Sequence, residues 1–172
     1  MTTQADPSPA QRAEYDLERL YRSEQLRGLI KRVRKDRRLS RPDFSVTRRS
    51  PVCGSEVTIE GTVDSRGVID RIGYRTRACS LAMASTGVLV QRAPGVAPEE
   101  ILRARHALRR ILSGQDSSAT AFPVWPELQC FSAAEQLPAR HASILLSFDA
   151  LVEGFCTSSH DKPFTSPRVQ QL

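Results

Sequence analysis

The chain has 172 residues, of which 40% are hydrophobic and 26% charged, a length and balance typical of one folded domain with short flanking segments. No stretch approaches the roughly 18 apolar residues of a membrane span, and residues 1–11 lack the apolar core of a signal peptide, so we expect a cytoplasmic protein. The net charge is +6, and residues 1–52 carry 13 Lys and Arg against 7 Asp and Glu. The excess positive charge therefore lies near the N-terminus.

The chain contains 4 cysteines, Cys53, Cys79, Cys130 and Cys156. It is longer than secreted domains that depend on disulfides and shows no export signal, so we expect the thiols to be reduced. The cysteines form no C-x-x-C pair and no close Cys/His cluster, which excludes zinc-ribbon and zinc-finger sites. Ligands for any bound metal must come from distant parts of the sequence.

The N-terminal part divides into an expected disordered lead, residues 1–13, and a predicted helix from about Glu14 to Lys35. Apolar residues at spacings of three and four give this helix one buried stripe: Leu17, Leu20, Tyr21, Leu26, Leu29, Ile30 and Val33. Its C-terminal end and the following residues are basic, notably Lys31, Arg34, Arg37 and Arg38. These cations are typical of a solvated face that complements the helix dipole, or of a docking surface for an acidic partner.

Three strands are predicted next, over residues 44–49, 56–64 and 68–76, because apolar and polar residues alternate in each. The turn Ser65-Arg66-Gly67 joins the last two into an antiparallel hairpin. The order of the strands predicts a three-stranded antiparallel meander.

Helices follow the strands. Small residues after Ser80, including Gly87, predict a buried helix that lets another backbone approach closely. Further helices are predicted from Pro98 to Gly114, over 126–135 and over 142–152. The predicted fold is therefore α+β: an N-terminal helix, a three-stranded antiparallel sheet and then four helices packed on the sheet, forming one domain over 14–155, with 156–172 as a flexible C-terminal tail.

Cys53 is expected at the turn between the first two strands, and Cys79 at the N-terminus of the small-residue helix. The free amides and dipole of a helix N-terminus favour a thiolate, so Cys79 is the better candidate for a ligand or nucleophile. A structural role for either cysteine as a small buried residue remains open.

Several motifs, in order, carry a resemblance to a known family: Leu17-Glu18-Arg19-Leu20-Tyr21, Ser50-Pro51-Val52-Cys53-Gly54-Ser55, Arg77-Ala78-Cys79-Ser80-Leu81-Ala82-Met83-Ala84-Ser85 and Leu137-Pro138-Ala139-Arg140. Together they resemble the U-type iron–sulfur cluster assembly scaffold proteins (NifU N-terminal, IscU and SufU-like). The chain looks closest to the SufU-like branch. An insertion from Gly114 to about Trp125 is similar to one in that branch, and Leu137-Pro138-Ala139-Arg140 resembles its F-P-A-R motif.

The resemblance implies an α+β scaffold domain that builds a cluster from desulfurase-supplied sulfur, or a zinc-bound sulfur acceptor. The family site has three cysteines and one aspartate. Cys53 and Cys79 match the first two cysteines, whereas Ser55 stands at the place of the aspartate and Ser143 at that of the third cysteine. A serine hydroxyl is a poor substitute because it does not ionise near neutral pH.

Three ways of completing the site stay open. His141 lies two residues before Ser143 and is a weak candidate for a substitute ligand. Cys156 and His160 have a C-x-x-x-H spacing beyond the last helix, whereas Cys130 is interpreted as a core residue. Two thiols from each of two molecules could also share a cluster across a homodimer.

The leading hypothesis is a scaffold-like protein of iron–sulfur cluster assembly that handles iron, sulfur or zinc through Cys53 and Cys79, with a desulfurase-like or other protein partner. The alternative is a degenerate scaffold fold kept as a structural or interaction module that binds no cofactor. The sequence shows no G-x-S-x-G, Gly-rich phosphate loop or H-E-x-x-H, so we expect no enzymatic turnover. With 6% aromatic residues there is no stacking platform for nucleic acid.

Overall fold

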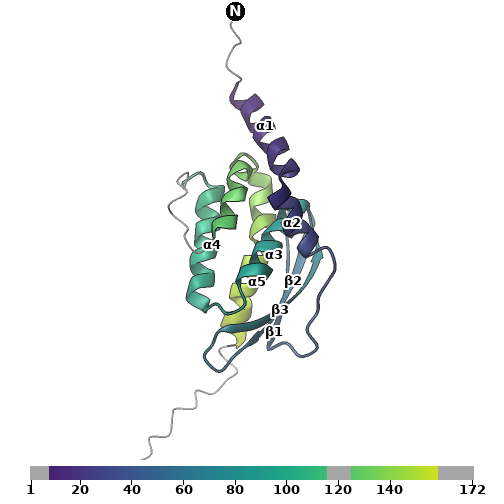
Figure 1. Cartoon of the computed structure of the whole chain (residues 1–172), viewed down its shortest axis with the longest axis vertical. Coiled ribbons are helices and arrows are strands. Elements are labelled where there is room, and N and C mark those ends of the chain that lie inside the picture. Colours follow the sequence, from purple (N-terminus) through teal and green to yellow (C-terminus); the bar gives the residue numbers. More distant parts are fainter. Residues whose placement is uncertain (1–7, 116–124, 159–172) are drawn as a thin grey trace, which may run out of the picture.

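The computed structural model describes residues 8–115 and 125–158. It shows a three-stranded sheet with the helices gathered on one side of it, while the first helix extends away from the body of the domain (Figure 1). This arrangement is the predicted α+β fold. Within the described residues, no helix is long and apolar enough to cross a membrane.

The N-terminal segment forms two helices, α1 (Pro9–Arg22) and α2 (Glu24–Arg32), where the periodicity predicts one helix over 14–35. Ser23 separates them because its extended backbone ends α1 and its hydroxyl accepts a hydrogen bond from the Leu26 amide at 3.1 Å, as the N-cap of α2. The prediction of one continuous helix was wrong, since a stripe of apolar residues does not reveal a cap in its middle.

The stripe itself is largely confirmed. The buried members in the described part are Leu20, Leu26, Leu29 and Val33, whereas Tyr21 is 44% exposed. Residues 9–13 belong to α1, so the ordered structure begins earlier than the expected lead over 1–13 allows, and residues 1–7 of that lead lie outside the described ranges.

The sheet contains β1 (Phe44–Arg49), β2 (Glu56–Val63) and β3 (Ile69–Arg77), antiparallel and in sequence order. Val57 and Ile59 of β2 lie on its buried face and are fully shielded from solvent. The segment between α2 and β1 returns along β3, where the backbones of Arg37 and Tyr74 exchange two hydrogen bonds. The predicted meander is therefore correct.

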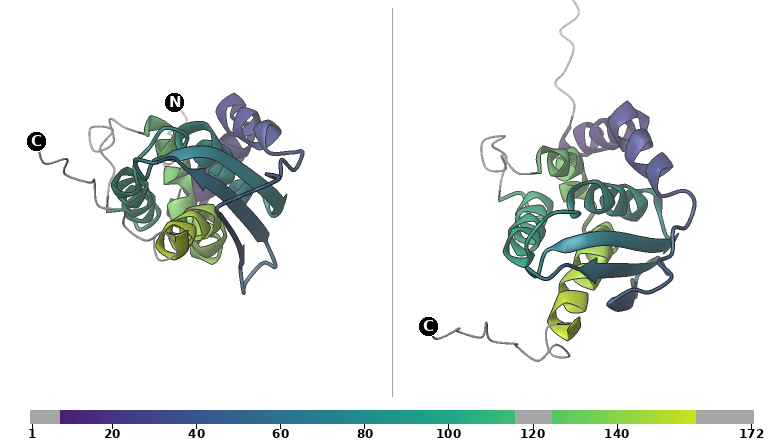
Figure 2. Two further views of the ribbon diagram at one scale, coloured as in Figure 1. Left: turned by 90° about the horizontal axis from the view of Figure 1, so that it is seen from below. Right: turned by 60° about the horizontal axis from the view of Figure 1, so that its bottom comes forward.

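The helices form two layers on the sheet (Figure 2). The longest, α5 (Pro138–Ser158), packs across β1 and β2, and α3 (Ser80–Arg92) lies between α5 and α2. The helices α4 (Pro98–Leu112) and η2 (Pro126–Gln136) pack on each other rather than on the sheet, α4 also against α5 and η2 also against α1.

Two details differ from the sequence analysis. The short helix predicted over 126–135 is a 3-10 helix, and α5 is about twice as long as predicted because it begins at Pro138 and continues through Cys156 to Ser158. The first three residues of the expected flexible tail are therefore helical, and residues 159–172 lie outside the described ranges, as do most residues of the SufU-like insertion.

The small residues of α3 do allow close packing. A Cβ atom at Gly87 would overlap the backbone carbonyl oxygen of Leu29 in α2. On the other side of α3, the Ser85 hydroxyl donates a hydrogen bond of 2.5 Å to the Ile144 carbonyl of α5. These two contacts hold the N-terminal half of α3, and with it Cys79, at a defined place between α2 and α5.

Candidate functional site

Cys53 lies in the connection between β1 and β2, as the sequence predicts. The segment is closed by hydrogen bonds from the Gly54 amide to the Ser50 carbonyl (3.2 Å) and from the Ser50 amide to the Ser55 carbonyl (2.8 Å). Gly54 has φ +68°, a left-handed conformation that glycine adopts without strain. This tight turn brings the Cys53 thiol back onto Ser55, with Sγ 3.1 Å from its Oγ.

Cys79 lies at the N-terminus of α3, as predicted, where it is the N-cap residue. Its backbone amide donates a hydrogen bond to the Ser55 hydroxyl oxygen at 3.1 Å, which ties the start of α3 to the Cys53 turn. Both thiols are half-buried and free of disulfides. One serine therefore contacts both cysteine residues.

Ser143 comes to the same place from α5. Its Oγ lies 3.6 Å from Cys79 Sγ and donates a hydrogen bond of 2.8 Å to the Arg140 carbonyl. Ser143 also lies close enough to Cys53 to act on its thiol. The structure thus brings together Cys53, Ser55, Cys79 and Ser143, which we call the two-thiol site.

The two-thiol site favours a thiolate at Cys53. Burial alone would raise the pKa of this thiol, but hydrogen bonds, led by those from Ser50 and Ser55, outweigh burial and lower the pKa to about 6. Ser143 contributes less than Ser50 and Ser55. Ser50 belongs to the sequence motif that contains Cys53, but its effect on the pKa of Cys53 could not be predicted without the geometry of the turn.

Two further side chains lie at the edge of the site and were not predicted to belong to it. Burial raises the pKa of the Tyr21 hydroxyl, the charge of Cys79 raises it further and the charge of Arg140 lowers it. These effects place Tyr21 of α1, Arg140 of α5 and Cys79 within electrostatic reach of one another. Val52, beside Cys53, is 64% exposed. An aromatic and a cationic residue are therefore near Cys79, and an exposed apolar residue adjoins Cys53.

The candidate substitutes do not join the cysteines. The His141 ring interacts with the Ala134 carbonyl of η2, with Nε2 at 2.9 Å. Among residues 8–115 and 125–158, no group of three His, Cys, Asp or Glu side chains could hold a metal ion. Cys156 is exposed in the last turn of α5, and His160 lies outside the described residues.

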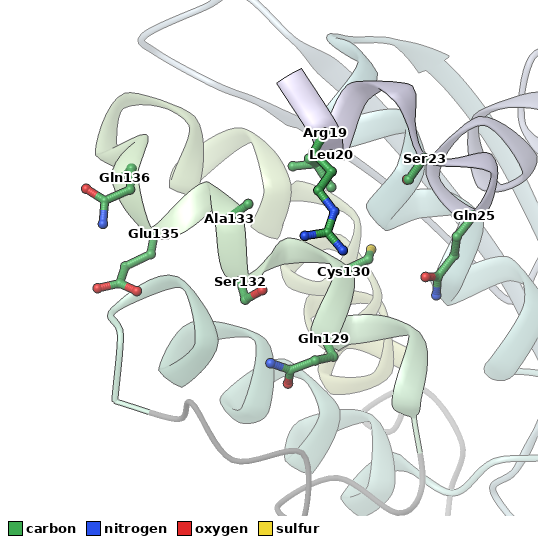
Figure 3. A pocket seen from close by; sticks show the side chains of 10 residues that line it. All are labelled: Arg19, Leu20, Ser23, Gln25, Gln129, Cys130, Ser132, Ala133, Glu135 and Gln136. Atoms are coloured by element: carbon green, nitrogen blue, oxygen red, sulfur yellow. The ribbon is translucent and has the colours of Figure 1, made fainter. Parts of the chain in front are cut away.

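Cys130 lines a groove of about 440 Å³ between the N-terminal helices and η2 (Figure 3). Burial, with a smaller effect of Glu127, raises the pKa of its thiol to about 12. The thiol is protonated at neutral pH, and Cys130 is a partly buried residue packed against the core rather than the fully buried core residue predicted from the sequence. The groove carries no second thiol among its described lining residues.

The basic residues predicted as a docking surface differ in whether they are paired with an acidic side chain of the same chain. Arg38 forms an ion pair of 2.5 Å with Glu60, whose side chain is 2% exposed. Lys31 and Arg34 are exposed at the end of α2. Asp36, in the same segment, lies 3.3 Å from Arg77. Part of the positive charge counted in the sequence is therefore used inside the fold.

The family model for the NifU-like N terminal domain matches residues 19–114. This match covers more than half of the chain, and together with the fold it shows that the protein belongs to the U-type iron–sulfur scaffold family, as its motifs predict.

Solved structures share the fold. The N-terminal part of a nitrogen-fixing NifU-like protein from Brucella abortus is 25% identical, with a TM-score of 0.77 over 86% of this chain and 99% of its own. A putative iron–sulfur cluster assembly scaffold protein for the SUF system from Fervidobacterium islandicum AW-1 is 19% identical, with a TM-score of 0.68 over 80% of this chain and 98% of its own. No curated protein sequence matches the chain.

Proposed function

We propose that this protein takes part in iron–sulfur cluster assembly as a scaffold-type protein that handles iron, sulfur or zinc through Cys53 and Cys79. The observation that carries the proposal is the convergence of the two cysteines with Ser55 and Ser143, the residues at the family's other two ligand positions. The ligand positions are therefore assembled in space although two of them have lost their donor atoms. The role is one of binding and transfer, without catalytic turnover.

One chain offers only half of a ligand set. Zinc and small iron–sulfur clusters take four thiolate or imidazole ligands, and the two serines are poor replacements. Because the described residues bring no further ligand to the two cysteines, we expect a four-ligand site to take two more donors from another molecule, either a second copy of this chain or a protein partner such as a desulfurase. The half-buried position of both thiols leaves them accessible to such a molecule.

The test is the amount of iron, zinc and acid-labile sulfide bound to protein purified without oxygen, before and after reconstitution. We expect bound metal in the wild type, its loss in Cys53→Ser and in Cys79→Ser, and no change in Cys156→Ser, which removes an exposed thiol outside the site. Equal metal content in all four proteins would contradict the proposal.

A gain of binding provides a second arm. Ser143→Cys places a third thiol near Cys53 and Cys79, and we expect zinc binding to tighten at least about 10-fold, because each added ligand of the preferred type strengthens a tetrahedral site. Ser147→Cys adds a thiol one helical turn further along the same helix, at another buried position, and serves as the matched control. Equal tightening by both variants would show that the added thiol, not its place, is responsible.

The second candidate function is an interaction module that binds no cofactor. One observation favours it: the Ser55 and Ser143 hydroxyls already have partners within the chain, the Cys79 amide and the Arg140 carbonyl, so the site is closed without a metal. In that case Lys31 and Arg34 are the cations to test, because replacing Arg38 would leave the buried Glu60 carboxylate unpaired. Lys31→Glu and Arg34→Glu should then weaken a complex with a desulfurase in a salt-dependent way.

A further inference from the structure

We infer that Cys53 and Cys79 form a two-coordinate site for a soft monovalent metal ion, with Cu(I) as the ion of this class that biology uses. The inference rests on the proposed function in one respect, namely that the two thiols act together on one ligand. It differs from the proposed function in the ligand, which is a monovalent metal ion, and it needs no second protein molecule to complete the site.

The number of available donors is the first argument. The Ser55 oxygen accepts a hydrogen bond from the Cys79 amide (3.1 Å), and the same oxygen lies 3.1 Å from the Cys53 sulfur. The Ser143 hydroxyl proton is held by the Arg140 carbonyl at 2.8 Å. Both hydroxyls are neutral and have partners within the chain, so two sulfur atoms are the only strong donors among the described residues of the site.

Two sulfur donors also restrict which metal ion the site can bind. Zn²⁺ requires four ligands in a tetrahedron, and iron–sulfur clusters likewise use four thiolates. Cu(I) is a soft ion with a filled d shell, which prefers thiolates and is satisfied by two of them in a near-linear arrangement. The two-thiol site supplies both of the thiols that this ion needs within one chain, whereas it supplies half of what the other groups need.

The net charge of the metal-bound site is also compatible with its surroundings. Two thiolates and one monovalent cation leave a net charge of −1, which a positive neighbour stabilises. Arg140 lies next to the site, because its backbone carbonyl accepts the hydrogen bond of Ser143 (2.8 Å), whose Oγ lies 3.6 Å from the Cys79 sulfur.

The test is a competition for Cu(I) without oxygen between the reduced protein and the chromophoric chelator bicinchoninate, followed by the absorbance of the chelator complex. We expect one Cu(I) per monomeric chain. Cys53→Ser and Cys79→Ser should each weaken binding at least about 100-fold, because loss of one of two ligands costs more than loss of an outer partner, which costs about 10–100-fold. Cys156→Ser is the control and should bind as the wild type does.

The inference is overturned if the wild type takes no Cu(I) from the chelator, if either serine variant retains it fully, or if one ion is shared by two chains. Far-UV circular dichroism verifies that each variant is folded, and Cys53→Ala or Cys79→Ala replaces a serine variant that is not. Iron, sulfide and zinc are measured on the same samples. Copper without these groups upholds the inference and contradicts cluster assembly, the reverse result contradicts the inference alone, and binding of nothing contradicts both.

Discussion

The hydrogen bonds around Cys53 show how single residues set the chemistry of the two-thiol site. Ser50 is 1% exposed, and its hydroxyl is one of the groups that stabilise the Cys53 thiolate. Ser55 contacts both cysteine residues, and the hydroxyl of Ser143 in α5 lies 3.6 Å from the Cys79 sulfur. Replacement of two expected ligands by serine has therefore left a polar, hydrogen-bonded site rather than an apolar one.

A pH dependence at the residue scale follows from these contacts. The pKa of Cys53 is about 6 instead of its ordinary value of about 9, so its thiolate is present above pH 6 and is lost as the pH falls below that value. Alkylation of Cys53 by iodoacetamide should therefore reach half of its maximal rate near pH 6. Cys130, with a pKa of about 12, should stay unmodified until the protein unfolds.

The measurement is peptide mapping by mass spectrometry after brief alkylation at a series of pH values. Ser50→Ala removes one hydrogen bond to the thiolate and should raise the pH of half-maximal alkylation at Cys53. An unchanged midpoint in Ser50→Ala would show that the other hydrogen bonds suffice.

At the scale of elements, the position of α3 depends on two close contacts. Gly87 allows α3 to touch the backbone of α2 at Leu29, and Ser85 joins α3 to α5. The sequence predicts the close approach of a backbone from the small residues of this helix, but it does not say which helix approaches. Ser23, in contrast, caps α2 through a contact only three residues away. The regular spacing of apolar residues on both sides of it suggested one continuous helix instead.

Two glycine substitutions test this packing. Gly87→Ala should destabilise the protein by about 1–3 kcal/mol, because the new Cβ overlaps the Leu29 carbonyl and forces α2 and α3 apart. Gly28→Ala is the matched control in α2, where a Cβ would meet nothing within 4 Å, and it should stabilise the protein by about 0.5–1 kcal/mol. Urea unfolding measures both, and effects of the same sign would contradict the packing described.

At the scale of the whole molecule, one buried carboxylate connects the segment after α2 to the sheet. Glu60 of β2 accepts hydrogen bonds from Arg38 Nε (2.7 Å) and the Leu39 amide (2.8 Å), and its side chain is 2% exposed. Burial alone would raise the pKa of Glu60, but Arg38 and Leu39 outweigh burial and lower it. The segment between α2 and β1 is therefore held across the sheet by a charged group.

This carboxylate predicts how the stability of the fold changes with pH. Because the pKa of Glu60 is lower in the folded state, its contribution is present above the unfolded value of about 4.3 and is lost as the pH falls through the folded value. Glu60→Gln should cost about 1–3 kcal/mol at neutral pH and progressively less in acid. Glu153→Gln, which removes an exposed ion pair with Arg48, is the control and should cost less than about 1 kcal/mol. Urea unfolding at several pH values measures both, and an equal loss for Glu60→Gln at all pH values would contradict this role.

The sequence by itself determined the elements and the family. Alternation located the three strands, apolar periodicity located the buried faces of the helices, and the motifs around Cys53 and Cys79 indicated a U-type scaffold. These features depend on neighbours within a few residues, where backbone geometry alone relates the side chains.

Conversely, the tertiary structure decided which residues meet. Cys79 and Ser143 are 64 positions apart in the chain, and their contact depends on the packing of α3 against α5. The position of η2 beside α5 directs His141 to Ala134 instead of the thiols, and the position of the segment after α2 against β2 pairs Arg38 with Glu60. No local pattern encodes such contacts, because they are set by how the finished elements fill space together.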